Sequence, residues 1–175
     1  MTMVLRPGQS VEDLVARGNT ACPGCAGALS RWGQARSRVV RGPGGEQRLR
    51  PRRVRCRACR VTHVVLPPDA LLRRRDGVAV VGRAWRSAAA GAGARRVAHQ
   101  LGVPMETVRG WLRRLRVLVQ EAYGGPTDGH QDRLRRGLAF LTAEADAAGC
   151  RDEADLWRFV AFRSQGRLLC NTNWL

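Results

Sequence analysis

Two CxxC pairs constrain this chain more than any other feature of its sequence. They are Cys22-Pro-Gly-Cys25 and Cys56-Arg-Ala-Cys59, and thirty residues separate them. A tight CxxC turn directs two thiolates to one side, and two such turns supply the four sulfurs of a closed tetrahedral zinc site. We therefore predict one structural Zn²⁺ bound by Cys22, Cys25, Cys56 and Cys59, with no open position for a substrate water.

Other uses of these cysteines fit the sequence less well. A redox-active CxxC pair favours a strand-to-helix setting, and disulfides need an oxidising compartment; neither context is present. His63 could replace a cysteine ligand, but the set is complete without it, so we expect a histidine on a strand face. The remaining candidates are expected not to be ligands: His99 and His130, and Cys150 and Cys170 as ordinary buried thiols.

The residues around the cysteines predict a zinc ribbon over residues 18–67. Residues 29–41 are expected to form a strand, residues 42–45 a turn, residues 49–55 a returning strand and residues 61–66 a third strand. The expected sheet is therefore three-stranded and antiparallel. A module of this size cannot bury enough apolar surface to fold without its metal.

After Pro67-Pro68 the pattern changes from alternating to helical, which predicts a mainly α domain over residues 69–123. The first helix is expected over residues 76–90, with Val78, Val81, Trp85 and Ala89 facing inward. A short helix over residues 94–101, a turn at Gly102-Val103, and a third helix from Pro104 to Tyr123 follow. The predicted fold class is α+β, with the zinc ribbon ahead of the helices.

Residues 94–113 resemble the bacterial helix-turn-helix signature along their whole length. Ala98 is the small residue between the helices, Gly102 forms the turn, and Val108 and Trp111 fill the space between them. The resemblance implies that the second helix enters the major groove of double-stranded DNA. The candidate DNA-binding residues are Arg95, Arg96, Met105, Glu106, Thr107, Arg109, Gly110, Arg113, Arg114 and Arg116.

These residues are expected to differ in what they contact. Arg109 and Arg113 suit guanine edges, whereas Arg95, Arg96, Arg114 and Arg116 suit phosphates. Glu106 either accepts a hydrogen bond from cytosine or stabilises the start of its helix. The alternative is a plain three-helix packing unit whose arginines are solvated.

The charge distribution favours a polyanion as partner. The chain carries 31 basic and 14 acidic residues, for a net charge of +17, and every basic residue is arginine. Residues 31–60 have a net charge of +10 and residues 61–116 of +8, whereas residues 117–175 have −1. This asymmetry indicates that the middle of the chain contacts the polyanion. A GC-rich genome would also favour arginine, and a basic surface without a partner is the remaining alternative.

Residues 128–175 are predicted to form a C-terminal helical segment for packing or dimerisation. Two apolar stripes at helical spacing support this: Leu134, Leu138, Leu141 and Ala145, then Leu156, Trp157, Val160 and Ala161. The segment either folds back onto the preceding helices, which we prefer, or pairs with a second copy as a homodimer. The apolar tail, residues 168–175, is also expected to dock.

Several motifs together resemble the zinc-ribbon and helix-turn-helix front end of insertion-sequence transposases, as in a group of small uncharacterised proteins of GC-rich bacteria. They are Cys22-Pro-Gly-Cys25, Arg31-Trp-Gly, Cys56-Arg-Ala-Cys59 with residues 61–64, and residues 108–112. The resemblance implies DNA binding linked to a mobile element or a transcriptional site. The acidic residues after position 116 have no strand pattern to carry a metal-binding triad, so we expect no enzyme.

We therefore predict a sequence-specific DNA-binding protein, either a transcriptional regulator or a mobile-element accessory. A basic zinc-ribbon protein that binds RNA or the ribosome is the alternative. The candidate protein partners are a second copy of the chain and a transposase or integrase. Neither a run of about 18 apolar residues nor a secretory-signal pattern is present, so we expect a cytoplasmic, nucleoid-associated protein without membrane contact.

Overall fold

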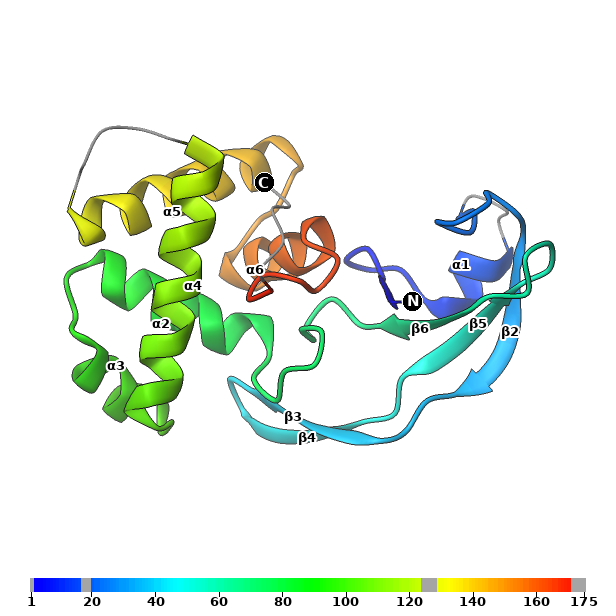
Figure 1. The fold of residues 1–175 in the computed structure, drawn as a ribbon, viewed down its shortest axis with the longest axis horizontal. Helices are drawn as coiled ribbons and strands as arrows, with labels where there is room; N and C mark the ends of the chain where they lie inside the picture. Colours follow the sequence, from blue (N-terminus) through cyan, green and yellow to red (C-terminus); the bar gives the residue numbers. More distant parts are fainter. Residues whose placement is uncertain (1, 17–19, 124–128, 171–175) are drawn as a thin grey trace.

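A computed structural model describes residues 2–16, 20–123 and 129–170. It combines a strand-rich body with a helical body, and a hairpin extends from the first toward the second (Figure 1). The α+β class predicted from the sequence is confirmed. The elements are β1 Thr2–Val4, α1 Val11–Ala16, β2 Leu29–Gln34, β3 Arg38–Gly42, β4 Gly45–Leu49, β5 Arg52–Cys56, β6 Thr62–Leu66, α2 Val78–Ala89, α3 Ala94–Leu101, α4 Met105–Tyr123, α5 His130–Ala147 and α6 Glu153–Arg163.

The main sheet is mixed and four-stranded, in the order β1-β6-β5-β2. β2 and β6 each pair antiparallel with β5, but β1 pairs parallel with β6, with Thr2 opposite Val64. The prediction of a three-stranded antiparallel sheet is therefore wrong. A three-residue strand shows no readable alternation, and its partner lies some sixty residues away along the chain, so no local pattern indicates the pairing.

The two long strands expected on either side of the turn are each divided. β2 and β5 belong to the main sheet, whereas β3 and β4 form a separate hairpin. Pro51 lies at the division and has no backbone N–H to donate, but its carbonyl accepts from the Ala35 N–H at 2.7 Å. The expected turn is confirmed: Gly42 pairs with Gly45, whose φ of +115° suits glycine.

The hairpin connects the strand-rich body to the helical one. The Arg41 N–H donates to the Arg75 carbonyl at 2.7 Å, and the Gly77 N–H donates to the Arg41 carbonyl at 2.8 Å. A side chain at Gly77 would meet the Asp69 carbonyl at 2.9 Å and the Arg41 carbonyl at 3.1 Å. The hairpin thus packs tightly against the start of α2.

α2 is the centre of the helical body. The expected inward residues Val78, Val81, Trp85 and Ala89 are all buried. The Trp85 indole donates to the Leu134 carbonyl at 2.8 Å, and Gly82 allows Trp157 of α6 to pack directly on the helix. Both C-terminal helices therefore fold back into the core of α2 and α4, as does the buried pair Leu168 and Leu169. Residues 171–175 of the expected docking tail lie outside the described residues, as do residues 124–128.

The short helix and the turn occur where the sequence predicted them. α3 spans Ala94–Leu101, and Gly102 ends it in the left-handed conformation at φ +61°. α4 begins at Met105, directly after Pro104, and lies with its first turns beside α3 (Figure 1). Within the described residues, no helix combines the length and apolar character needed to cross a membrane.

Candidate metal centre and basic surface

The four cysteines lie on two loops with the same local structure. The Cys22 N–H donates to the Gly27 carbonyl and the Cys56 N–H to the Val61 carbonyl, both at 2.9 Å. The residue after each second cysteine adopts a left-handed conformation, with φ +57° at Ala26 and +62° at Arg60. These repeated features make both loops compact knuckles.

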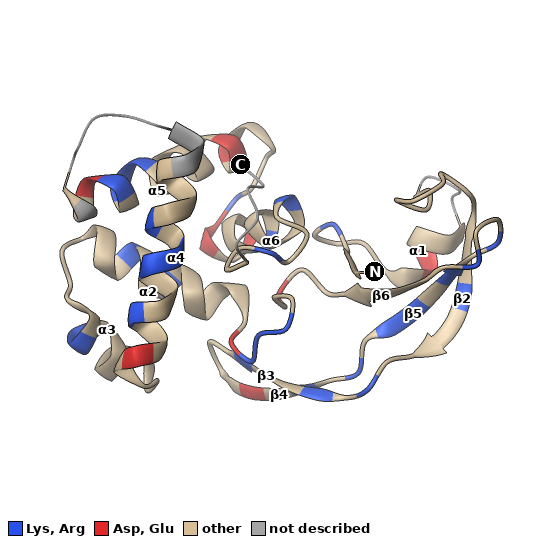
Figure 2. Cartoon of the chain, viewed as in Figure 1, with Lys and Arg blue, Asp and Glu red and all other residues tan. Residues whose placement is uncertain are grey.

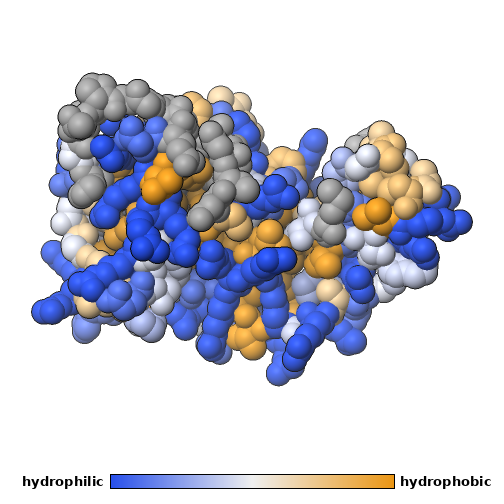
Figure 3. Space-filling model, viewed as in Figure 1, coloured by the Kyte–Doolittle hydropathy of each residue, from blue (hydrophilic) through white to orange (hydrophobic). Residues whose placement is uncertain are grey.

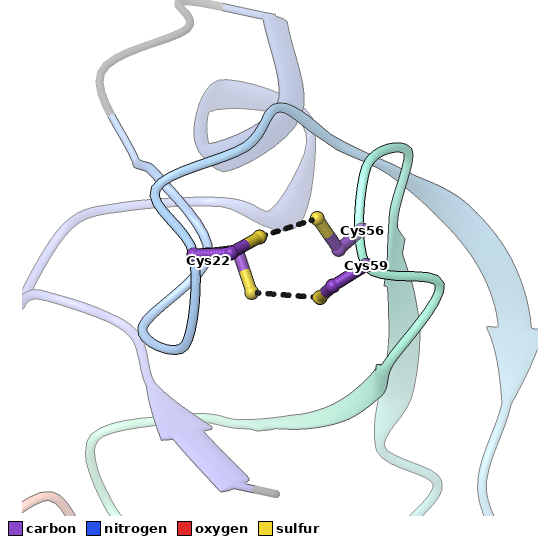
Figure 4. Close-up of side chains that lie close together, drawn as sticks. Cys22, Cys56 and Cys59 are labelled. Carbon is purple, nitrogen blue, oxygen red and sulfur yellow. Dashed lines mark hydrogen bonds between the residues drawn. The ribbon is translucent and has the colours of Figure 1, made fainter.

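The two knuckles face each other across a small gap, and Figure 4 shows Cys22 opposite Cys56 and Cys59. With Cys25, these are the four cysteines that the sequence predicted as ligands. One sulfur atom from each cysteine lies within 4.8 Å of all the others. The Sγ atoms of Cys22 and Cys59 are 3.7 Å apart, and those of Cys25 and Cys56 are 3.4 Å apart. All four cysteines are free thiols, so the cluster can hold a metal ion.

Local hydrogen bonds and the close spacing of the sulfurs shift the pKa values of two of the thiols in opposite directions. Hydrogen bonds from the Gly27 backbone, then from the Cys59 and Cys56 thiols, lower the pKa of Cys25. At Cys59 the Val61 backbone bond lowers the pKa, but Cys25, partial desolvation, Cys56 and Cys22 together raise the pKa to about 12. Without a positive counter-charge, four sulfurs this close cannot all be ionised, whereas a bound cation would stabilise four thiolates.

Gly27 allows the knuckles to approach. A Cβ atom at this position would lie 2.8 Å from the Ala58 Cβ, closer than real Cβ contacts, and 3.0 Å from the Cys56 Sγ, which is tighter than most of them. By contrast, a Cβ atom at Gly24 would lie 3.9 Å from the nearest sulfur, an ordinary contact. Glycine is therefore required at position 27 for the packing of one knuckle on the other.

His63 contacts the cluster, which the sequence did not indicate. It lies on β6 opposite Val54, is fully buried, and its Nε2 is 3.4 Å from the Cys22 Sγ. Burial lowers the pKa of His63, which favours the neutral ring. The expected strand-face position is correct, and the ring supports a cysteine rather than replacing one. Strand alternation could have indicated the burial of His63, because His63 and Val65 lie on the same, inward face of β6.

The other excluded ligand candidates do not join a cluster among the described residues. Cys150 and Cys170 are half-buried, less than expected, and burial raises the pKa of Cys150. His99 is exposed on α3, and the side chain of His130 lies outside the described part.

The structure distributes the candidate DNA-binding residues over α3 and α4. Arg95, Arg96, Glu106, Arg109 and Arg113 are exposed, whereas Met105, Thr107, Gly110, Arg114 and Arg116 are half-buried. Figure 2 shows the basic positions along α4, and further arginines on β2, β4 and β5. The face in Figure 3 is mainly hydrophilic from the helical body to the sheet.

Contacts within α4 restrict some of these residues. Arg109 forms an ion pair with Glu106 at 2.6 Å, and the Arg114 guanidinium donates to the Gly110 carbonyl at 3.0 Å. Met105 packs against the helical core. Of the two arginines expected to contact guanine, Arg113 forms no ion pair or hydrogen bond through its side chain within the described residues of α4. Arg109 would have to exchange its exposed ion pair with Glu106 for a contact with DNA.

A shallow pocket of about 240 Å³ lies where α4 passes the start of α3. Gly93, Ala94, Arg109 and Arg116 contribute to its lining. Gly93 caps α3 without a side-chain hydrogen bond. Two arginine side chains therefore line a pocket beside the positive end of a helix dipole, an arrangement that attracts anions.

Part of the chain is similar to a described family. Residues 22–100 match the family model for a domain of unknown function (DUF6431). No curated protein and no solved structure is significantly similar to the chain. The matched stretch begins at the first cysteine of the cluster and ends near the end of α3, so similarity to that family includes the whole metal centre and α2 but not α4.

Proposed function

We propose that this chain is a sequence-specific DNA-binding protein, a transcriptional regulator or a mobile-element accessory, with one structural zinc ion. In this proposal α3 and α4 form a helix-turn-helix, and α4 enters the major groove. The observation that carries it is the division of α4: Val108, Leu112 and Leu115 are buried, while Arg109 and Arg113 are exposed on the opposite side. We assign the chain no catalytic residue.

The sulfur geometry supports zinc as the metal. A Zn–S bond of about 2.3 Å gives a tetrahedron with edges of about 3.8 Å. The distances of 3.7 Å and 3.4 Å between paired sulfurs are close to this value. Zinc bound by four thiolates would order both knuckles and, through them, the strands of the ribbon.

The junction between α3 and α4 supports a groove-binding helix. Val97 and Ala98 of α3 and Val103 of the turn are buried together with Val108 and Trp111 of α4. This packing fixes the angle between the helices without using the exposed arginines. α4 is therefore a rigid support for groups that would contact bases.

The pocket at the start of α3 supports contact with the DNA backbone. A phosphate there would accept from unpaired N–H groups of the helix start and from Arg116, while the exposed Arg95 and Arg96 would meet neighbouring phosphates. Such contacts fix the position of α4 on the duplex. They supply affinity that depends on salt, whereas base contacts supply specificity.

The test begins by selecting bound duplexes from a random pool with the zinc-loaded full chain. Affinity for the selected duplex and a scrambled one is then measured by fluorescence anisotropy at several salt concentrations. Arg113→Ala should weaken binding of the selected duplex by about 5- to 150-fold and relax specificity. Arg95→Ala should weaken both duplexes equally and reduce the salt slope by about 0.9. Arg151→Ala, exposed between α5 and α6, is the matched control.

Several outcomes would refute this function. Equal affinity for the selected and the scrambled duplex at physiological salt would refute sequence-specific binding. Higher affinity for structured RNA than for duplex DNA would favour RNA or ribosome binding instead. Protein without stoichiometric zinc would refute the metal assignment. Sedimentation with and without DNA tests a homodimer, and co-purification with a transposase or integrase tests that partner. The proposal places the protein in the nucleoid of the cytoplasm.

A further inference from the structure

An exposed tryptophan lies at a bulge on the outer face of the main sheet. Trp32 is 52% exposed, whereas Trp85, Trp111 and Trp157 are at most 4% exposed. The register between β2 and β5 shifts between Arg31 and Gly33, so Trp32 has no opposite residue. A β-bulge redirects the side chain of its extra residue, and an exposed indole contributes little to folding.

An arginine covers one side of this indole. The Arg55 guanidinium lies over the Trp32 ring at 4.3 Å from its centroid, and its Nε donates to the Arg60 carbonyl at 3.1 Å. Arg60 belongs to the second cysteine knuckle, so this knuckle helps to hold Arg55 in place. One face of the ring is thus stacked against a cation, and the large exposure of Trp32 leaves the other face open.

The surroundings of Trp32 are strongly basic. Arg53 and Arg55 point to the same face of β5, because Val54 between them is buried on the other. Arg53 pairs with Gly33, directly after the tryptophan, and is exposed. Arg57 is exposed at the start of the second knuckle. The open indole is therefore flanked by groups that bind phosphates.

We propose that Trp32, Arg53 and Arg55 form a binding site for an unpaired nucleotide of a single-stranded nucleic acid. A flat base would stack on the open face of Trp32, and Arg53 would bind the adjoining phosphate. Bases within a duplex already cover each other's faces, so this site favours an unpaired strand. It lies on the strand-rich body, away from α3 and α4 (Figure 1), and goes beyond the function proposed for those helices.

The test uses the zinc-loaded full chain and labelled oligothymidylate or oligouridylate of about 12 nucleotides, with a blunt duplex as competitor. Trp32→Ala should weaken binding of the single strand by about 5- to 150-fold, whereas Trp32→Phe should keep most of the affinity. Val61→Ala removes another exposed apolar side chain near the knuckle and should bind normally. Arg55→Ala should also weaken binding, but Arg151→Ala should not.

Tryptophan emission supplies a second readout. The oligonucleotide should quench the wild-type emission, and Trp32→Phe should lose this quenching while it still binds. Unchanged affinity in Trp32→Ala would overturn the proposal. So would an equal loss in Trp32→Ala and Val61→Ala, or loss of zinc from Trp32→Ala, because the tryptophan would then be structural. Failure of the Arg113→Ala duplex experiment would refute only the function proposed for α4.

Discussion

Gly27→Ala should weaken metal binding without removing a ligand. The new methyl group would lie 2.8 Å from the Ala58 Cβ, which cannot rotate away, and 3.0 Å from the Cys56 Sγ, which is fixed by the cluster. Forcing an extra methyl group into a packed site costs about 1–3 kcal/mol. Because the contact joins the two knuckles, most of this energy should be lost from metal affinity, which corresponds to about a 5- to 150-fold decrease.

The decrease can be measured by competition for Zn²⁺ with a chromophoric chelator. Co²⁺ spectra would show in the same samples whether four thiolates still surround the metal. Gly24→Ala is the matched control, since its methyl group would lie 3.9 Å from the Cys22 Sγ, and the affinity should remain within about twofold of wild type.

A second substitution tests the assigned cause. Ala58→Gly removes the atom at 2.8 Å, so the double variant should recover part of the lost affinity, and the remaining loss should reflect the Cys56 contact. If Gly27→Ala bound zinc as tightly as Gly24→Ala, the close approach of the knuckles would be wrong. If Ala58→Gly restored nothing, the loss would arise elsewhere than at this contact.

Three further predictions concern other parts of the molecule. Gly82→Ala would place a methyl group 2.1 Å from the Trp157 ring, so the free energy of unfolding, measured by thermal unfolding, should fall by about 1–3 kcal/mol or more. Gly44→Ala is the control and should have a small effect, because a methyl group there would meet nothing within 4 Å. Glu106→Ala should free Arg109 and remove a negative charge, which should raise duplex affinity by about two- to fivefold in anisotropy measurements; unchanged affinity would contradict a DNA contact by Arg109, and lower affinity would indicate that Glu106 itself contacts a base. Burial raises the pKa of Asp76 against the opposing charges of Arg41 and Arg75. The folded state therefore keeps this proton to higher pH than the unfolded chain does. The free energy of unfolding of wild type should fall relative to that of Asp76→Asn as pH rises from about 4 through the folded-state pKa. If denaturant titrations gave the two proteins the same dependence of this free energy on pH, the assigned pKa shift would be wrong.

The sequence alone was sufficient for features that depend on a few neighbouring residues. The CxxC spacing identified the four cysteines that the structure brings together, because each tight turn fixes two thiols locally. The limits of α3 and the turn at Gly102 were also predicted, since a left-handed glycine ends a helix by local geometry. Apolar spacing likewise identified the buried side of α2.

Only the tertiary structure decided which distant segments meet. The pairing of β1 with β6, the burial of His63 against Cys22 and the open face of Trp32 all depend on residues far apart in the chain. Such contacts form only when the packing of the whole fold offsets the entropic cost of closing long loops. This total depends on the complete structure, so a local sequence pattern does not indicate it. Short-range backbone and thiol geometry therefore determined the knuckles, whereas long-range packing determined which surfaces remain exposed.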